Sequence, residues 1–101
     1  GLTGFVAGTA RQVAPFGVTI NNVLPGAHDT DRITQLDAAT AKAEGGSAEA
    51  VRARKMAAIP AGRYGDAADF GAICAFLCSD QAKFIVGQNI LVDGGAINAT
   101  L

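Results

Sequence analysis

The sequence is poor in charge, and the charge it has is nearly balanced. Charged residues make up 17% of the 101 residues, against roughly 25% in an average soluble domain, and 50% are hydrophobic. Intrinsic disorder requires the opposite balance, so this composition excludes it. Eight basic and nine acidic residues give a net charge of −1, which predicts no nucleic-acid partner and no polybasic membrane patch.

Cysteine, histidine and nucleotide-binding motifs are also scarce. Two cysteines without a secretory signal argue against a disulfide framework, and Cys74 and Cys78 are expected to be buried structural thiols of one helix. No metal site is expected, because the only histidine, His28, lies in a separate loop. The chain contains no G-x-G-x-x-G, Walker or G-x-S-x-G motif, and its apolar start is too short and glycine-rich to span a bilayer.

The first quarter of the chain is almost free of charge. Arg11 carries the only formal charge among residues 1–28, and the chain begins with Gly1 in what reads as the middle of a helix. Both features lead us to expect a piece of a larger protein, or a surface that a partner covers.

Apolar residues at helical spacing predict a helix over residues 1–14. Gly4 and Gly8 form a small-x-x-x-small pair within it, and each glycine costs roughly 1 kcal/mol of helix propensity. A helix tolerates that cost where another backbone approaches closely. Two interpretations stay open: a buried core helix, or a helix covered by its own sheet on one face and by another subunit on the other.

An α/β pattern follows from the segments on either side of the polar middle. Residues 18–24 form a short apolar run bounded by turns, which predicts a strand buried on both faces. A helix is predicted from Asp66 to about residue 79, with Asp66 and Asp69 as a carboxylate version of the capping box. Residues 84–86 and 89–92 are expected to form a last strand. This order of helix, turn and strand is typical of parallel α/β units.

The polar middle of the chain, residues 27–58, carries most of the charge and shows two weak helical patterns. Ser47 is a plausible N-cap for the second helix, and residues 43–47, with two glycines, are expected to form a hinge. Such an insertion is either a lid over a site or a plain surface helical hairpin.

The loop directly after the first predicted strand, residues 25–30, is the place to look for a site. Ligands of open parallel α/β sheets bind in crevices at the carboxyl ends of the strands. His28 in this loop is the one side chain that titrates near neutral pH without perturbation, although a lone loop histidine is usually only solvated.

Several weak segments, taken in order and spacing, resemble one family. They are residues 17–21 (GVTIN), Pro25 and Gly26 followed by Thr30, residues 60–65 (PAGRYG), residues 76–79 (FLCS) and residues 87–95 (GQNILVDGG). Together they resemble the C-terminal part of a short-chain dehydrogenase/reductase, and most closely the 3-oxoacyl-carrier-protein reductase-like subset. The resemblance covers nearly the whole chain. It implies that residues 1–101 are the C-terminal portion of a doubly wound Rossmann fold, with two parallel strands plus helices, and that residues 31–59 are the substrate lid.

The resemblance also implies a cofactor site. The residues that would hold the nicotinamide of NAD or NADP are Pro25, Gly26, Ala27, His28 and Thr30. Backbone groups near His28 would face the carboxamide, and the Thr30 hydroxyl would lie beside the cofactor. The family's catalytic serine, tyrosine and lysine would all lie upstream of this chain. Tyr64 falls in a different motif and is expected to pack.

The function implied is that of an NAD(P)-dependent oxidoreductase acting on a carbonyl or alcohol. This chain would supply the nicotinamide loop, the lid and oligomer contacts, and would be inactive and free of cofactor alone. The expected partners are a small carbonyl or alcohol substrate, the N-terminal half of the same protein and further copies in a homotetramer, all in the cytoplasm. The alternative is a non-catalytic structural or oligomerisation module, which the absence of Tyr-x-x-x-Lys just upstream of Gly1 would favour.

Overall fold

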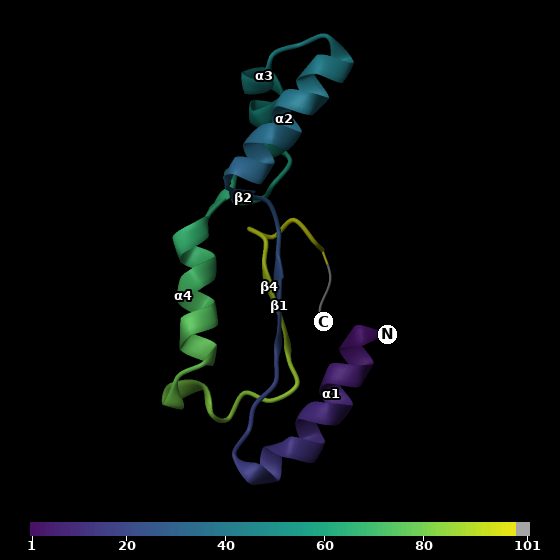
Figure 1. Ribbon diagram of the computed structural model, residues 1–101. Helices are drawn as coiled ribbons and strands as arrows, with labels where there is room; N and C mark the ends of the chain where they lie inside the picture. The colour runs from purple at the N-terminus through teal and green to yellow at the C-terminus, as the bar shows by residue number, and fades with distance from the viewer. Residues whose placement is uncertain (99–101) are drawn as a thin grey trace.

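Helices and short strands follow one another along the chain in a computed structural model, which describes residues 1–98 (Figure 1). The last three residues of the predicted segment 1–101 therefore lie outside the described part. The elements in chain order are α1 (Leu2–Val13), η1 (Ala14–Phe16), β1 (Asn22–Pro25), β2 (His28–Asp29), α2 (Asp31–Glu44), α3 (Ala48–Ala57), β3 (Gly65–Asp66), α4 (Ala67–Leu77), η2 (Asp80–Ala82) and β4 (Asn89–Val92).

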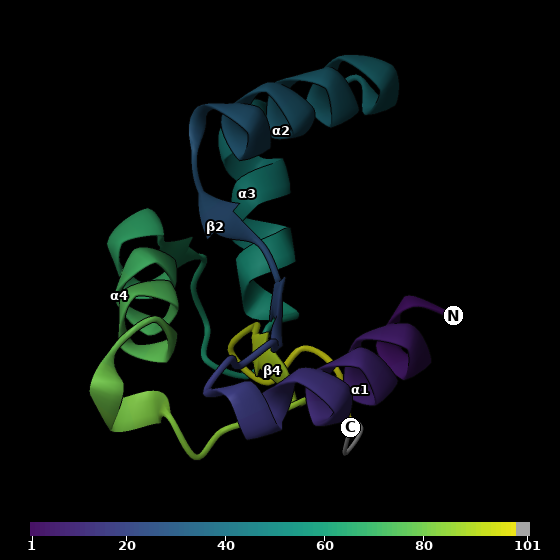
Figure 2. The same cartoon turned by 60° about the horizontal axis from the view of Figure 1, so that its bottom comes forward.

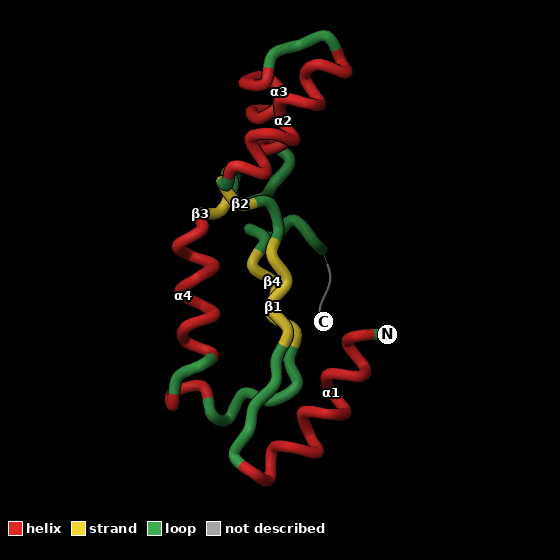
Figure 3. Tube along the Cα trace, in the orientation of Figure 1, coloured by secondary structure: helices red, strands yellow, loops and turns green. Residues whose placement is uncertain are grey.

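The strands form two separate parallel ladders. β1 pairs with β4 in a register that runs from Asn22 opposite Asn89 to Pro25 opposite Val92. β2 pairs with β3, with His28 opposite Gly65. The tube view shows α4 beside the β1–β4 ladder, in the connection that leads to β4 (Figure 3). The predicted α/β class, with two neighbouring parallel strands joined through the helix after residue 66, is confirmed.

The strand boundaries differ from those predicted. The first strand starts at Asn22 rather than at residue 18, and residues 84–86 are not a strand, because Ile85 N donates to Ala82 O and continues the turn of η2. Gly87, at φ +70°, then redirects the chain before β4 begins. β1 is also half-buried rather than buried on both faces. Its only ladder partner among the described residues is β4, so the ladder ends where their overlap ends.

Upstream of β1, the Asn21 side chain makes hydrogen bonds to the backbone of the segment before β4. Its Nδ2 donates to the carbonyl of Ile85 at 3.0 Å, and its Oδ1 accepts from the backbone N–H of Gln88 at 2.9 Å. One amide thereby satisfies a donor and an acceptor of the irregular segment before β4.

The N-terminal helix is confirmed, and most of its surface is exposed within the described residues. Only Val6 and Ala10 are buried, whereas the side chains of Leu2 and Phe5 are 72% and 69% exposed. Within residues 1–98, and apart from the neighbouring backbone of α1 itself, no heavy atom comes within 4 Å of where a Cβ on Gly8 would stand. This face of α1 is therefore open in the described part of the chain.

The helix after Asp66 forms as predicted, without the predicted capping box. Asp66 is the N-cap residue of α4, but its side chain makes no cap hydrogen bond. The Asp69 carboxylate lies instead 3.8 Å from the guanidinium of Arg63, and this exposed pair competes with the capping geometry.

The two cysteines are not both buried. Cys74, within α4, is half-buried, whereas Cys78 is exposed, and both are free thiols. Cys78 is the C-cap residue of α4, at the point where the chain turns away toward η2, so it loses the cover that its helical position predicted. Among residues 1–98 there is no group of three His, Cys, Asp or Glu side chains that could hold a metal ion.

The described chain is elongated and has little core. Its radius of gyration is 17.0 Å, against about 13 Å for a compact domain of this length, and its extents are 55 × 26 × 21 Å. The α2–α3 hairpin stands at one end and α1 at the other (Figures 1 and 2). The buried hydrophobic residues are Val6, Ala10, Ala41, Val51, Tyr64 and Ala82. No helix in the described part is long and apolar enough to cross a membrane.

Candidate functional site

A cavity of about 450 Å³ opens where β1 ends and the chain passes into β2 and α2. Five of its lining residues are those predicted to hold a nicotinamide: Pro25, Gly26, Ala27, His28 and Thr30. The others come from α2 and α4: Arg32, Ile33, Leu36, Ala67 and Phe70. The cavity lies at the carboxyl end of a parallel strand, which is where ligands of such sheets bind.

Gly26 fixes the exit of the loop from β1. Its N–H donates to the carbonyl of Val92 at 2.9 Å, which ties the loop to the end of β4. A Cβ at this position would stand 2.7 Å from Cβ and 2.8 Å from Cα of Asp93, closer than real Cβ atoms approach. Only glycine fits here without moving the backbone of the next strand end, so the Pro25–Gly26 turn depends on this close approach.

The His28 imidazole is half-buried and is held by contacts within the chain. Its Nδ1 lies 3.0 Å from the carbonyl oxygen of Gly26 and, because a carbonyl only accepts, Nδ1 carries the proton of this bond. The ring meets Phe70 edge to face at 5.5 Å and packs so close to Gly65 that a Cβ there would lie 2.8 Å from it. In the neutral ring Nε2 is then left as an acceptor.

Thr30 has a structural task that the sequence analysis missed. It is the N-cap residue of α2, where its Oγ1 accepts from the backbone N–H of Ile33 at 3.5 Å and its carbonyl accepts from Thr34 N at 3.1 Å. The hydroxyl acts only as an acceptor in this cap. Its own O–H therefore stays free to donate to a ligand.

Sequence reasoning also missed the lining residues from the helices. Ile33 and Leu36, three positions apart on α2, were read only as part of a helical pattern, and Phe70 only as part of the apolar face of α4. All three line the cavity. The spacing identified the apolar faces but not what they cover, because that depends on where the two helices lie relative to β1.

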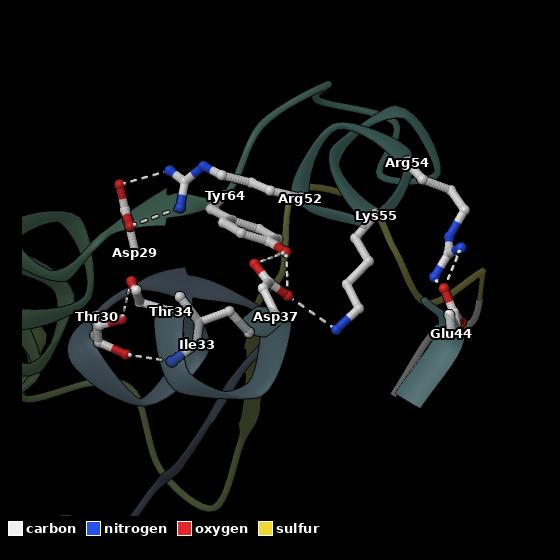
Figure 4. A network of polar contacts seen from close by, with 10 residues as sticks. All are labelled: Asp29, Thr30, Ile33, Thr34, Asp37, Glu44, Arg52, Arg54, Lys55 and Tyr64. Atoms are coloured by element: carbon white, nitrogen blue, oxygen red, sulfur yellow. Dashed lines mark hydrogen bonds and ion pairs between the residues drawn. The ribbon is translucent and has the colours of Figure 1, made fainter. Parts of the chain in front are cut away.

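A buried carboxylate links the α2–α3 hairpin to the loop before β3 (Figure 4). Asp37 and Tyr64 are each 3% exposed, and the Tyr64 hydroxyl donates to Asp37 Oδ2 at 2.9 Å. Lys55 Nζ donates to Asp37 Oδ1 at 2.9 Å. Burial works to raise the pKa of Asp37, but the hydrogen bonds from Lys55 and Tyr64 outweigh it, so the pKa lies below its ordinary value. Burial and then the Asp37 carboxylate raise the pKa of Tyr64.

Arg52 connects the same hairpin to β2. Its two terminal nitrogens donate to the Asp29 carboxylate at 3.0 and 2.8 Å, and its guanidinium lies 4.8 Å from the centre of the Tyr64 ring. These hydrogen bonds lower the pKa of Asp29. Tyr64, expected only to pack, is therefore buried as predicted and also bonded through its hydroxyl and its ring face. The partners lie 23 and 27 positions apart in sequence, so no local pattern indicated them.

Known proteins are similar to this chain over most of its length. The family model described as enoyl-(acyl carrier protein) reductase matches residues 1–97. The 3-oxoacyl-(acyl-carrier-protein) reductase FabG of Salmonella typhimurium is 39% identical over 95 residues, which cover 94% of this chain and 34% of that protein. FabG of Aquifex aeolicus is 34% identical over the same length. The chain thus spans about a third of the length of these curated relatives, 34% of each.

Solved structures show the same fold. YwfH, an NADPH-dependent reductase involved in bacilysin biosynthesis, superposes with a TM-score of 0.87 at 31% identity, covering 98% of this chain and 37% of YwfH. A short-chain dehydrogenase family protein of Francisella tularensis superposes at 0.88 with 27% identity, covering 94% of this chain and 39% of that one. The parallel α/β arrangement of the described residues matches part of the fold of both neighbours. The chain belongs to the short-chain dehydrogenase/reductase family.

Proposed function

We propose that this chain is the C-terminal segment of an NAD(P)-dependent reductase of carbonyl compounds, and the corresponding portion of its doubly wound Rossmann fold. It supplies the loop that holds the nicotinamide, the lid over the substrate and contacts between subunits. The observation that carries the proposal is that Pro25, Gly26, Ala27, His28 and Thr30 all line one cavity at the carboxyl end of β1.

The residues around this cavity suit a nicotinamide. The carboxamide group needs both a donor and an acceptor to fix its plane, and the loop offers the Thr30 hydroxyl, the His28 ring and backbone groups around them. Ile33 and Phe70 provide an apolar wall for the flat ring. Bound there, the cofactor supplies the hydride. Among the structural neighbours, YwfH is described as NADPH dependent and an actinorhodin polyketide ketoreductase was solved with NADPH, which supports NADP as one candidate cofactor.

The similar proteins carry names for two different reactions. An enoyl reductase reduces a carbon–carbon double bond, whereas a 3-oxoacyl reductase reduces a ketone. The FabG relatives, up to 39% identical, favour the ketone as the substrate group. The helix face with Ile33 and Leu36, within the proposed lid of residues 31–59, would contact the rest of the substrate.

The catalytic serine, tyrosine and lysine are proposed to lie upstream of Gly1, so the chain alone is expected to be inactive. The test uses the full-length protein that contains this segment. We expect it to consume NADPH or NADH with a 3-oxoacyl thioester and not with the matched enoyl thioester. Turnover of the enoyl thioester alone would overturn the substrate assignment. Cofactor binding without turnover of either would favour the second candidate function.

That second candidate is a non-catalytic assembly module, and it is supported by the exposed apolar side chains at the α1 end and before β4. Phe5, Phe16 and Phe84 are 69%, 82% and 99% exposed. Large exposed apolar patches usually mark interfaces. Both candidates thus include association, which we propose to be a homotetramer. Reading the residues just upstream of Gly1 separates them, since Tyr-x-x-x-Lys there favours the enzyme.

A further inference from the structure

The side chains of the short segment 28–30 point to two opposite sides of the backbone. It is extended, as β2 and as a Thr30 backbone at φ −131° and ψ 168°. Successive side chains of extended backbone point to opposite sides. His28 and Thr30 accordingly line the cavity, while Asp29 between them turns away from it and reaches Arg52 on α3. This segment therefore lines the proposed cofactor site on one side and contacts the proposed lid on the other.

The contact on the lid side constrains orientation as well as distance. The Arg52 guanidinium donates two parallel hydrogen bonds, of 3.0 and 2.8 Å, to the Asp29 carboxylate. A bidentate pair of this kind fixes the relative orientation of both groups. Its guanidinium also lies over the Tyr64 ring, at 4.8 Å from the ring centre. Figure 4 shows the Arg52 side chain between Asp29 and the Tyr64 ring.

A second contact reaches the same ladder from α2. The Tyr64 hydroxyl donates a hydrogen bond to the buried carboxylate of Asp37 on α2. Lys55 of α3 donates a second hydrogen bond to the same carboxylate. Tyr64 directly precedes β3, whose Gly65 donates to the carbonyl of Ala27 at 3.0 Å. The α2–α3 hairpin is thus fastened to both strands of the β2–β3 ladder, once through Asp29 and once through Tyr64.

We propose that Arg52, Tyr64 and Asp37 are positioning residues that couple the seating of the α2–α3 hairpin to the conformation of residues 27–30, so that the geometry of the cavity depends on the hairpin being seated. The inference deepens the proposed function, on which it rests for the identity of the ligand. Coupling of this kind is reciprocal. A ligand that orders residues 27–30 also orders the hairpin, and a hairpin that is less firmly seated lowers the affinity for the ligand.

The chain offers a matched control for Arg52. Arg54, on the same helix, also grips a carboxylate with two hydrogen bonds, to Glu44 at 2.9 and 3.2 Å. That pair joins α3 to the far end of α2 and does not touch the ladder. Arg52→Gln and Arg54→Gln therefore remove the same kind of contact from the same hairpin, and only the first removes a contact with Asp29.

The first experiment measures amide hydrogen exchange in the full-length protein without added ligand. We expect Arg52→Gln and Tyr64→Phe to speed exchange in residues 27–30 about two- to fivefold, the range that loss of one exposed ion pair or one hydrogen bond permits. Arg54→Gln is expected to leave those amides unchanged. Equal exchange at residues 27–30 in the Arg52 and Arg54 variants would overturn the coupling.

The second experiment measures NADPH dissociation constants for the same variants. Arg52→Gln is expected to weaken binding about two- to fivefold, Arg52→Lys less because the charge remains without the bidentate pair, and Arg54→Gln not at all. The double variant Asp29→Asn/Arg52→Gln should be no weaker than Arg52→Gln, because the two residues act through one contact. Faster exchange at residues 27–30 with unchanged NADPH affinity would keep the coupling and overturn the cofactor assignment of the cavity.

Discussion

Among the described glycines, Gly26 is the one at which an added Cβ would come closest to another atom. The Cβ of an alanine would meet both Cα and Cβ of Asp93 below 3 Å, and Asp93 is itself fixed because its carboxylate accepts from the N–H groups of Gly95 and Ile97 at 3.0 Å. The clash must therefore be relieved by moving the loop.

We expect Gly26→Ala to lower the free energy of unfolding by about 1–3 kcal/mol, the usual cost of forcing extra volume into a close contact. Gly46→Ala is the control, because no atom lies within 4 Å of its Cβ position and its φ is not positive. Urea denaturation of both variants is the measurement. An equal effect of the two substitutions would show that the contact between Gly26 and Asp93 is not tight in solution.

Asp37 makes stability depend on acid pH. Its pKa is depressed in the folded chain, so its contribution is fully present above the ordinary Asp value of about 4 and is lost as pH falls through the lower folded pKa. Asp29 and Glu44 share this direction through their arginine partners. We therefore expect Asp37→Asn to reduce, without abolishing, the fall in stability below about pH 4.

Tyr64 makes stability depend on alkaline pH as well, and its absorbance is a direct optical probe of the same network. It is the only tyrosine, and the chain has no tryptophan, so the phenolate absorbance reports this residue alone. Its raised pKa means that its contribution is present below about pH 10 and is lost as pH rises through the folded pKa. In Asp37→Asn the phenolate should appear at lower pH, whereas an unchanged titration would contradict the Tyr64–Asp37 contact.

At the scale of elements, the helices were predicted well because their information is local. The apolar spacing of α1 and α4 and the Ser47 cap of α3, whose Oγ accepts from Ala50 N at 3.1 Å, are contained in short stretches of sequence. The strands were predicted less well because a ladder's extent depends on its partner. β2 and β3, two residues each, are too short to show any periodicity.

The candidate site divides in the same way. The position of residues 25–30 after a strand indicated a site there, and the family resemblance named five of these residues as cofactor-binding. The five share a cavity, and their role stays a prediction. Arg52, Asp37 and Lys55 were not, because each finds its partner across 18 or more positions of sequence. Only the placement of the hairpin over the β2–β3 ladder brings them together.

The segment before β1 offers a test of how an element is held without a ladder. Asn21 bonds both Ile85 and Gln88, and Asn21→Ala leaves one acceptor and one donor without their partner. We expect a loss of about 1–3 kcal/mol in the free energy of unfolding. Gln35→Ala, at an exposed position of α2, should stay within about 0.5 kcal/mol. Thermal or urea unfolding of the two variants measures this difference in the free energy of unfolding. Equal losses in both variants would contradict the role of Asn21.

At the scale of the molecule, the described chain is elongated, and apolar side chains are exposed on both α1 and α4. Leu2, Phe5 and Phe76 are 72%, 69% and 43% exposed. Water contact over that much apolar surface is unfavourable, which predicts that the 101-residue chain associates in solution. Gly8→Glu, which places a charge on the open face of α1, should weaken that association. Light scattering over a range of concentrations is the check, and a soluble monomer throughout would contradict it.

Residues 25–30 are proposed to hold the nicotinamide end of the cofactor, and a substitution at Thr30 can test this role. Thr30 and Ser47 are both helix N-caps whose side chains accept a backbone N–H, but only Thr30 lines the cavity. Replacing either cap costs about 0.5–2 kcal/mol of stability, so stability alone cannot separate a cap from a cofactor contact.

The measurement is the dissociation constant of NADPH or NADH for the full-length protein, its Thr30→Val variant and its Ser47→Ala variant. Thr30→Val keeps the shape of the side chain and removes the hydroxyl, so we expect binding about two- to tenfold weaker, the value of one hydrogen bond. Ser47→Ala should bind as the unmodified protein does. Equal cofactor affinity in all three would contradict the assignment of this loop to the cofactor.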